Sequence, residues 1–438
     1  MALQQAIITK RTTFVKTVLM ILLILASRWI VKKNNKHISI VQDESNKFEA
    51  EEIIVDKKQE VLNERKLTTH RVQTTDKITD NRAGINADIK HDESPVELNQ
   101  KMEDSKTVRF VDILNITSPV ELVKRLNEIQ MDILQGVIGK YKQVVFFDLA
   151  DIENKGDPAI TVGELNILAK LNLNVLTYCS YQCSDESMRD IRNFLNDSAM
   201  SSSEQSVVLS SGGGNFGGYK YNDYKRSMLL KLFPTYNFLL FSQSTWFDFD
   251  DGSHLKFVQK AYSKHKHFTA LLRDKASYEF TKATFPTLRP ILAPDMAFGI
   301  GLVPRFFRAT LDVIWIHRRD PESPGEMHPK FPPNISYKVM DWFSDWPSPR
   351  GQNLIDWSYM MTYNGFLFLQ RGKVLVTDRL HGHILATLLD MPTVIIDNKI
   401  HKISNLRNTW TKGLAKVVMA DNDQDAVNKA IHILNKIH

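Results

Sequence analysis

The sequence predicts an α/β protein built from two Rossmann-like halves that face a cleft. Short apolar runs alternate with helical stretches from about Val108 onward, a pattern typical of parallel sheets covered by helices. The alternation stops at an irregular, proline-bearing segment, residues 317–334, and then resumes. Polar clusters follow several of the apolar runs directly. In open α/β sheets, ligands bind beyond the carboxyl ends of the strands.

The N-terminal region predicts a membrane anchor. Residues 17–27, TVLMILLILAS, are apolar and have basic residues on both sides. A spanning helix needs roughly 20 residues, so Lys16 and Arg28 would have to extend toward the lipid headgroups. A cleavable signal peptide is the alternative, but ASRWIVKK at 26–33 is a poor cleavage site. We therefore expect residues 1–36 to form a short cytosolic tail and an uncleaved signal anchor.

The orientation of this anchor is predicted from glycosylation sequons. Basic residues flank both ends of the apolar run, so their distribution favours neither orientation. The triplets at Asn115, Asn196 and Asn334 would accept glycans if the bulk of the chain were lumenal. We expect a single-pass type II protein of the Golgi or another secretory-pathway membrane. Residues 37–106 are charged and nearly free of aromatic side chains, which predicts a flexible stem.

The first domain is expected over residues 107–305. Its predicted strands are short apolar runs with the composition of buried parallel strands. They are QVVFFDL (143–149), LNVLTY (173–178), SVVLS (206–210), NFLLFS (237–242), FTALL (268–272) and PILAPDM (290–296). Helical stretches lie between them, for example at 159–171 and 222–233.

The second domain is expected over residues 306–438, with a helix at its end. Its predicted strands are LDVIWIH (311–317), KVLVT (373–377) and PTVIID (392–397). The stretches 353–370 and 381–390 have the pattern of helices that connect them.

Composition limits the possible functions of the chain. Its 438 residues, 43% of them hydrophobic, suffice for two domains with real cores. The net charge of +6 is spread along the chain without a block of like charges, so a nucleic-acid-binding tail is not predicted. Only Cys179 and Cys183 are present, too few for a disulfide scaffold or a four-cysteine zinc site. One bridge between them is possible, but we predict two thiols.

Four polar clusters stand at predicted strand ends, where helix N-termini favour anions. They contain Asn154, Gly156 and Asp157; Gly213, Gly214 and Asn215; Arg273 and Asp274; and Asp378, Arg379 and His381. Because the clusters follow several strands and face one sheet edge, they predict a single cleft.

Each cluster also has a structural explanation. Asp157 before Pro158 fits a helix N-cap. Residues 211–218 are expected to form a glycine-rich loop, and glycine-rich turns are common without a ligand. Arg273 could form a surface ion pair with Asp274. His381 could be a core histidine bonded to a backbone carbonyl.

Arg379 is the hardest of these residues to explain structurally. A cation in the first turn of a helix opposes the helix dipole, so something negative should compensate it. Either Asp378 or a bound anionic ligand could do so.

The same segments resemble the polysaccharide pyruvyl transferase family over roughly residues 140–400. The shared pieces are NKGDPAI, SGGGNFGG, LLRDKAS, APDMAF, VLVTDRLHGHILA and MPTVIID. The resemblance implies a GT-B-like fold and transfer of pyruvate from phosphoenolpyruvate onto two hydroxyls of a sugar as a ketal. It also implies that Arg273 and Arg379 hold the phosphate and carboxylate of the donor, with Leu380 contributing through its backbone. His381 would be the catalytic acid/base.

The chemistry of this reaction suits these residue types. Guanidinium groups match both anionic groups of phosphoenolpyruvate, and histidine is the usual group for transferring a proton near neutral pH. Phosphoenolpyruvate is a co-substrate, and we expect neither a further cofactor nor a metal. The expected partners are this donor, a glycan acceptor and the membrane, and not nucleic acid. The alternatives are a GT-B-type glycosyltransferase that uses a nucleotide sugar and a non-catalytic glycan-binding protein.

Overall fold

The computed structural model describes residues 112–197, 203–247, 252–348 and 353–437. The predicted anchor (1–36) and stem (37–106) lie outside these ranges and remain predictions. Within the described ranges, no helix combines the length and the apolar character needed to cross a membrane.

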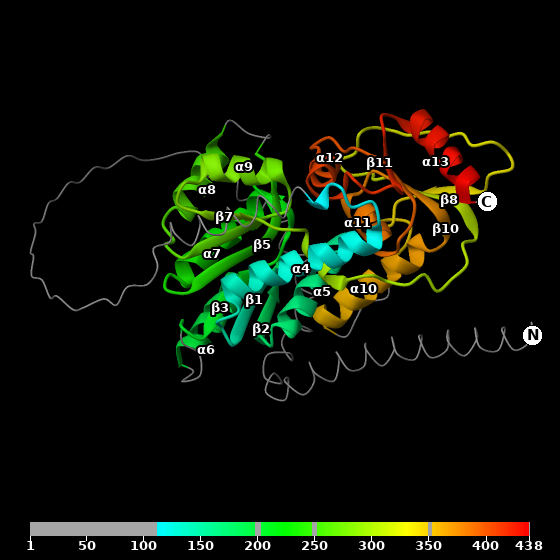
Figure 1. Ribbon diagram of the computed structural model, residues 1–438. Coiled ribbons are helices and arrows are strands. Elements are labelled where there is room, and N and C mark those ends of the chain that lie inside the picture. The colour runs from blue at the N-terminus through cyan, green and yellow to red at the C-terminus, as the bar shows by residue number, and fades with distance from the viewer. Residues whose placement is uncertain (1–111, 198–202, 248–251, 349–352, 438) are drawn as a thin grey trace, which may run out of the picture. The chain divides into compact units, whose positions relative to one another are not determined.

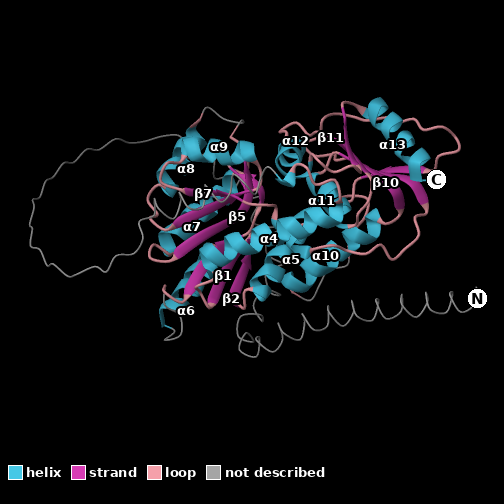
Figure 2. Ribbon diagram, in the orientation of Figure 1, coloured by secondary structure: helices cyan, strands magenta, loops and turns pink. Residues whose placement is uncertain are grey.

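Two parallel sheets confirm the predicted α/β class (Figure 2). The first sheet has seven strands in the order β2-β1-β3-β5-β6-β7, with β4 paired to β5, and every recorded pair in it is parallel. Its strands are β1 (Gln143–Leu149), β2 (Asn174–Ser180), β3 (Ser206–Ser210), β4 (Gly213–Phe216), β5 (Asn237–Thr245), β6 (Phe268–Leu272) and β7 (Arg289–Leu292).

Helices cover both faces of this sheet, because alternate side chains of each strand point to opposite faces. Along β1, Val144 and Phe146 belong to one hydrophobic core, and Val145 and Phe147 belong to another. The first core includes side chains of α4 (Pro119–Ile138) and α5 (Gly156–Lys170), which lie together in Figure 1. The second includes side chains of α6 (Asp185–Asp197), α7 (Lys220–Leu232) and α8 (Ser253–Tyr262). The α-helix between β6 and β7 is α9 (Lys275–Thr284).

The second sheet is five-stranded and parallel, in the order β12-β11-β10-β8-β9. Its strands are β8 (Leu311–Ile316), β9 (Tyr337–Met340), β10 (Gly372–Thr377), β11 (Thr393–Ile396) and β12 (Val417–Ala420). Its helices are α10 (Leu354–Leu369), α11 (Leu380–Leu388), α12 (Lys402–Leu406), the π-helical segment η3 (Arg407–Thr411) and α13 (Asp423–Ile437). The expected domain boundary at residue 305 lies in the connection between β7 and β8.

The two sheets share a core. Ile314 and Leu375 of the second sheet belong to the same buried cluster as Val144 and Phe146 of the first. The opposite face of the second sheet, which includes Trp315, packs in a separate cluster with α13. The two halves therefore pack against each other through buried apolar side chains. This packing fixes the polar strand ends of one sheet relative to those of the other.

Three local predictions were wrong. Residues 211–218 were expected as a loop, but Gly213–Phe216 form β4 and pair with β5. The strand expected at 290–296 ends at Leu292, and a 3₁₀ helix, η2 (Met296–Ile300), follows it. Cys179 and Cys183 form a disulfide, with Cα atoms 5.6 Å apart. The spacing of four residues allowed this bridge, but only the path of the chain after β2 brings the sulfur atoms together.

Candidate active site

A cavity of about 670 Å³ is lined by residues of both halves. Its walls come from chain segments that directly follow the strands, as the rule for parallel α/β sheets predicts. Five cationic and five anionic side chains line it. They are Arg273, Arg318, Arg319, Arg379 and Lys402, and Asp148, Asp157, Asp320, Glu322 and Asp341.

Arg273 is a buried arginine at the end of β6. Its Nε donates to Ser244 Oγ at 2.8 Å, and its Nη1 donates to Asp295 Oδ2 at 2.9 Å. The side chain is only 2% exposed, so the surface ion pair with Asp274 considered above is wrong. Asp274 instead caps α9 by accepting from the backbone N–H of Ser277 at 2.8 Å. Among the described residues, no hydrogen-bond partner is recorded for Nη2 of Arg273, which leaves this donor for a ligand.

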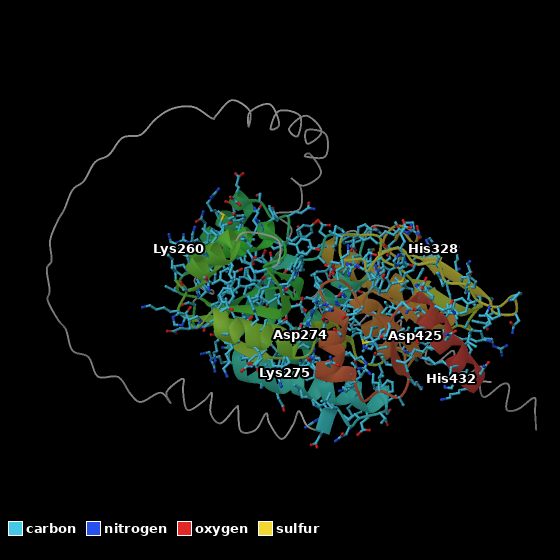
Figure 3. The ribbon with its side chains drawn as sticks, turned by 90° about the horizontal axis from the view of Figure 1, so that it is seen from above. Lys260, Asp274, Lys275, His328, Asp425 and His432 are labelled. Atoms are coloured by element: carbon cyan, nitrogen blue, oxygen red, sulfur yellow. A yellow bond between two sulfur atoms is a disulfide. The ribbon has the colours of Figure 1, made fainter. Side chains whose placement is uncertain are left out.

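Asp274 and its neighbour Lys275 also lie where the two halves meet (Figure 3). The backbone N–H of Lys275 donates to Thr409 Oγ1 of η3 at 3.0 Å. The indole N–H of Trp410 donates to the carbonyl oxygen of Arg273 at 2.7 Å. The segment that presents Arg273 is therefore bonded directly to the second half of the molecule.

Arg379 is at the N-cap position of α11 and has an extended backbone, rather than lying in the first turn. Its Nε and Nη2 bind the two oxygens of Asp341 at 2.8 and 2.7 Å. Asp341 therefore supplies the expected negative charge, and Asp378 does not. Asp378 binds the Nδ1 atom of His317 at 2.7 Å and accepts from the backbone N–H of Arg318. Within the described part of the chain, Nη1 of Arg379 has no recorded hydrogen bond.

His381 lies on the cavity wall in the first turn of α11, next to Leu380, which also lines the cavity. Its Nε2 is buried, lies 3.5 Å from Asp295 Oδ2 and makes no recorded hydrogen bond to any residue that the structure describes. The structural explanation considered above, a core histidine bonded to a backbone carbonyl, is therefore wrong. The carboxylate that this nitrogen faces also binds Arg273.

His383 is the core histidine of this helix. It is fully buried, and its Nε2 pairs with Thr411 Oγ1 at 2.9 Å. Burial and the nearby Arg407 charge lower the pKa of His383 to about 3. The two histidines of the HGH motif therefore have different surroundings, and only His381 reaches the cavity.

The start of α5 supplies Asn154 and Asp157 to the cavity. Asp157 is not the N-cap, because Lys155 occupies that position and Asp157 lies in the first turn. Asn154 organises the turn: its Oδ1 accepts from Gly156 N–H at 3.1 Å, and its Nδ2 donates to Asp157 Oδ2 at 2.8 Å. Gly156 packs beneath the ring of His381 and does not itself line the cavity.

The glycine-rich segment forms another wall, through Gly213, Gly214 and Asn215. Gly213 has φ of 143°, a conformation that favours glycine. Arg226, which is fully buried, binds the backbone and side-chain oxygens of Asn215. Because Asn215 is held from both its main chain and its side chain, β4 presents a rigid edge to the cavity.

Several charged cavity residues were not anticipated from the sequence. Lys402 donates to Glu322 Oε1 at 2.9 Å and to the carbonyl oxygen of Gly214 at 3.2 Å, which connects the halves. Arg318 Nη1 binds Glu322 Oε2 at 2.7 Å. Burial tends to raise the pKa of Glu322, but Lys402 and Arg318 outweigh it and lower the pKa to about 2. Glu322 and Arg318 come from the irregular segment 317–334, whose only signal was its density of charged residues.

The structure thus brings Arg273, Arg379, Leu380 and His381 to one cavity, with Asn154, Asp157 and the β4 residues Gly213, Gly214 and Asn215. The sequon residues Asn115, Asn196 and Asn334 are exposed and lie elsewhere.

Comparison with known proteins shows to which family the chain belongs. A sequence model of the family described as "Polysaccharide pyruvyl transferase" matches residues 154–400, more than half of the chain. The chain belongs to the polysaccharide pyruvyl transferase family. Apart from Asp148, Ala150, Ile152 and Lys402, every residue that lines the cavity falls inside the matched segment.

Curated relatives point to the same family. This family member is 31% identical over 315 residues to Pyruvyl transferase 1 of Schizosaccharomyces pombe, covering 67% of this chain and 75% of the relative. It is 26% identical over 247 residues to a Bacillus subtilis protein that bears the provisional name pyruvyl transferase EpsO, covering 52% and 76%. A solved structure of an uncharacterized Klebsiella pneumoniae protein aligns with a TM-score of 0.45 at 16% identity, covering 68% of this chain and 98% of that one.

Proposed function

We propose that this protein transfers the pyruvate unit of phosphoenolpyruvate onto two hydroxyls of a glycan sugar, forming a ketal within a GT-B-like fold. The observation that carries the proposal is the meeting of Arg273, Arg379 and His381 at one cavity in a member of the pyruvyl transferase family. Two guanidinium groups match the two anionic groups of the donor, and an imidazole beside them suits the proton transfer.

Arg273 and Arg379 are already held in fixed positions from which they can bind an anionic ligand. Each is fixed by a buried carboxylate, Asp295 for Arg273 and Asp341 for Arg379. Each also keeps one terminal nitrogen without a recorded partner in the described structure. A guanidinium that is already held in place loses little side-chain entropy when it binds a phosphate or carboxylate. The donor would bind these free nitrogens without displacing the two carboxylates.

The reaction can be balanced with His381 as the only acid/base. Protonated His381 gives a proton to the methylene carbon of the donor, and C2 becomes an oxocarbenium-like centre. A sugar hydroxyl attacks C2, and its proton passes to His381, which restores the imidazolium. The C2–phosphate bond then breaks, the second hydroxyl attacks C2, and its proton leaves with the phosphate. The products are a pyruvate ketal and inorganic phosphate.

The proposal includes a location for the enzyme. We place it in the Golgi or another secretory-pathway membrane, as a single-pass type II protein with its two-sheet body in the lumen. The disulfide Cys179–Cys183 and the exposed positions of the three sequons support an oxidising compartment where glycans are attached. If glycosidase treatment of the protein from a eukaryotic cell leaves its mobility unchanged, this placement loses its support.

The donor can be tested by thermal stabilisation. We expect phosphoenolpyruvate, and not a nucleotide sugar, to raise the melting temperature of the full chain. The opposite result would indicate a GT-B-type glycosyltransferase. Donor binding without phosphate release on any member of a glycoside panel would indicate a binding protein.

The role of His381 is tested with a matched pair of variants. His381→Ala should lower turnover by about a hundredfold or more and leave donor affinity within a few-fold. His383→Ala, two residues along the same helix, should cost stability and leave turnover per folded molecule close to normal. If His381→Ala is destabilised yet turns over normally, the catalytic role is wrong.

A further inference from the structure

The imidazole of His381 is held on two sides by the first half of the protein. On one side it packs against Gly156 at the start of α5. On the other, its buried Nε2 lies 3.5 Å from Asp295 Oδ2 and has no hydrogen-bond partner within the described ranges. Catalytic hydrogen bonds are often long in ligand-free structures and shorten in the complex. A buried ring nitrogen that faces a carboxylate at this distance needs only a small movement to form such a bond.

Asp295 is itself fixed in place. It is fully buried and caps η2, with its Oδ1 accepting from Ala297 N–H at 2.9 Å. Its carbonyl oxygen accepts from Gln130 Nε2 at 2.8 Å. The preceding residue is also bonded, since Ser242 Oγ donates to the Pro294 carbonyl oxygen at 2.8 Å. With both its main chain and its side chain bonded, Asp295 offers the ring a rigid acceptor.

A single oxygen of Asp295 serves both functional side chains. Oδ2 lies 2.9 Å from Arg273 Nη1 and 3.5 Å from His381 Nε2. Burial tends to raise the pKa of Asp295, but His381 and Arg273 outweigh it and lower the pKa to about 2. Asp295 is therefore ionised at any pH where the protein would act. The Asp295 carboxylate therefore lies between Arg273, which is proposed to bind the donor, and His381, which is proposed to transfer the proton.

We propose that Asp295 is the positioning residue of this site, holding the Nε2 proton of His381 so that Nδ1 performs the proton transfer. The same oxygen fixes Arg273, so the donor anion and the proton-transferring ring would be set relative to each other by one carboxylate. A carboxylate that holds one ring nitrogen fixes the tautomer and stabilises the imidazolium. This inference rests on the proposed function.

The test compares Asp295→Asn with wild type and with Asp223→Asn in the full chain. Asp223 is the matched control because it is fully buried and bonded to an arginine and a histidine, Arg226 and His254. None of these three side chains lines the cavity. Asp295→Asn should lower kcat by about a hundredfold or more. Because the asparagine oxygen can still accept from Arg273, the donor KM should change by only a few-fold. Asp223→Asn should lower stability while leaving kcat near normal.

A spectroscopic measurement separates positioning from simple support of the fold. In ¹⁵N-histidine-labelled wild type without donor, at a pH where the ring is neutral, the His381 ring should carry its one proton on Nε2, and Asp295→Asn should alter this signature. Signals are assigned with His381→Gln. Because the wild-type spectrum alone tests the claim, a poorly folded Asn variant would not prevent a decision. A neutral His381 ring protonated on Nδ1 in the wild type would overturn the inference.

The kinetic outcomes distinguish this inference from the proposed function. If His381→Ala is inactive but Asp295→Asn turns over normally, positioning by Asp295 is wrong and the acid/base role of His381 stands. If His381→Ala turns over normally, both ideas are overturned. Loss of kcat in both variants with donor KM preserved supports them together.

Discussion

Gly156 lies directly against the imidazole ring of His381. A Cβ atom built on Gly156 would fall 2.4 Å from His381 Nδ1 and 2.6 Å from its Cβ. Real carbon atoms essentially never approach this closely, so any side chain at 156 would push the ring aside. The contact joins the first turn of α5 to the first turn of α11, and it explains why a glycine is needed at this position.

Gly156→Ala should therefore damage activity more than stability. Displacing the ring should lower turnover by about tenfold or more, because small misplacements near the reacting atoms are costly. Overpacking should cost about 1–3 kcal/mol of unfolding free energy. The control is Gly136→Ala in α4, where a Cβ meets nothing within 4 Å; it should stabilise by up to about 1 kcal/mol. Normal turnover in Gly156→Ala would show that catalysis does not require the His381 ring to lie against residue 156.

The two arginines should each contribute to donor affinity. Arg273→Ala and Arg379→Ala are each expected to weaken phosphoenolpyruvate binding by about 1.5–3 kcal/mol, measured by calorimetry. Lysine at either position should restore only part of this, since it lacks the planar fork. The control is Arg319→Ala, because Arg319 also lines the cavity but its side chain is 56% exposed. Unchanged affinity in both of the first two variants would remove these residues from the site.

The same substitutions should also lower stability, and the two effects must be measured separately. Arg379→Ala leaves the buried carboxylate of Asp341 without its bidentate partner, which typically costs about 3–5 kcal/mol. Denaturation of the ligand-free protein measures this cost. A loss of donor affinity in protein that is still folded at the assay temperature reports the binding role alone.

Glu164 should make stability fall as pH rises. It is fully buried on α5, where its oxygens accept from Gly212 N–H at 2.7 Å and Ser211 Oγ at 2.8 Å. Burial raises its pKa well above 4.5, and the hydrogen bonds oppose this only in part. Above pH 4.5 the unfolded chain ionises first, so the folded state loses stability until its own pKa is passed.

Glu164→Gln should remove this pH dependence, because glutamine can keep both bonds without a charge. Its carbonyl oxygen can accept from Gly212, and its amide can donate to Ser211 Oγ. The variant should match wild type near pH 4 and become relatively more stable toward pH 8, as measured by urea denaturation across this range. Parallel pH profiles for the two proteins would contradict the prediction.

The disulfide should stabilise the first half of the molecule. A bridge that closes so short a loop, Cys179 to Cys183, should contribute about 2 kcal/mol by restricting the unfolded chain. The double variant Cys179→Ser, Cys183→Ser should lose about this much unfolding free energy in non-reducing urea titrations. Wild type in reducing buffer should behave like the variant, whereas an unchanged midpoint would argue that the bridge contributes nothing.

Local sequence patterns predicted nine of the twelve strands in the described part of the chain, missing β4, β9 and β12, and they predicted the sheet edge where the candidate site lies. The runs at 143–149, 206–210 and 268–272 match β1, β3 and β6 to the residue, because a short, mainly apolar run between polar segments has few other ways to be buried. Parallel strands meet at one edge with their carboxyl ends. This is why Arg273 and His381, 108 positions apart in sequence, could be expected in one cavity.

The partners of those residues depended on the tertiary structure. Asp295 lies 22 positions from Arg273, and Asp341 lies 38 positions from Arg379, separations at which hydrophobic periodicity carries no information about contact. Glu322 and Lys402 form an ion pair although they are 80 positions apart in sequence.

The short polar segment 213–216 was likewise expected to be a loop. It forms the strand β4 because it pairs with β5, and not because its own residues favour a strand. The sequence by itself determined which residues follow the strands. Only the packing of the two sheets on a shared core decided which carboxylate each arginine and histidine faces, because that choice depends on distances in space that no local pattern encodes.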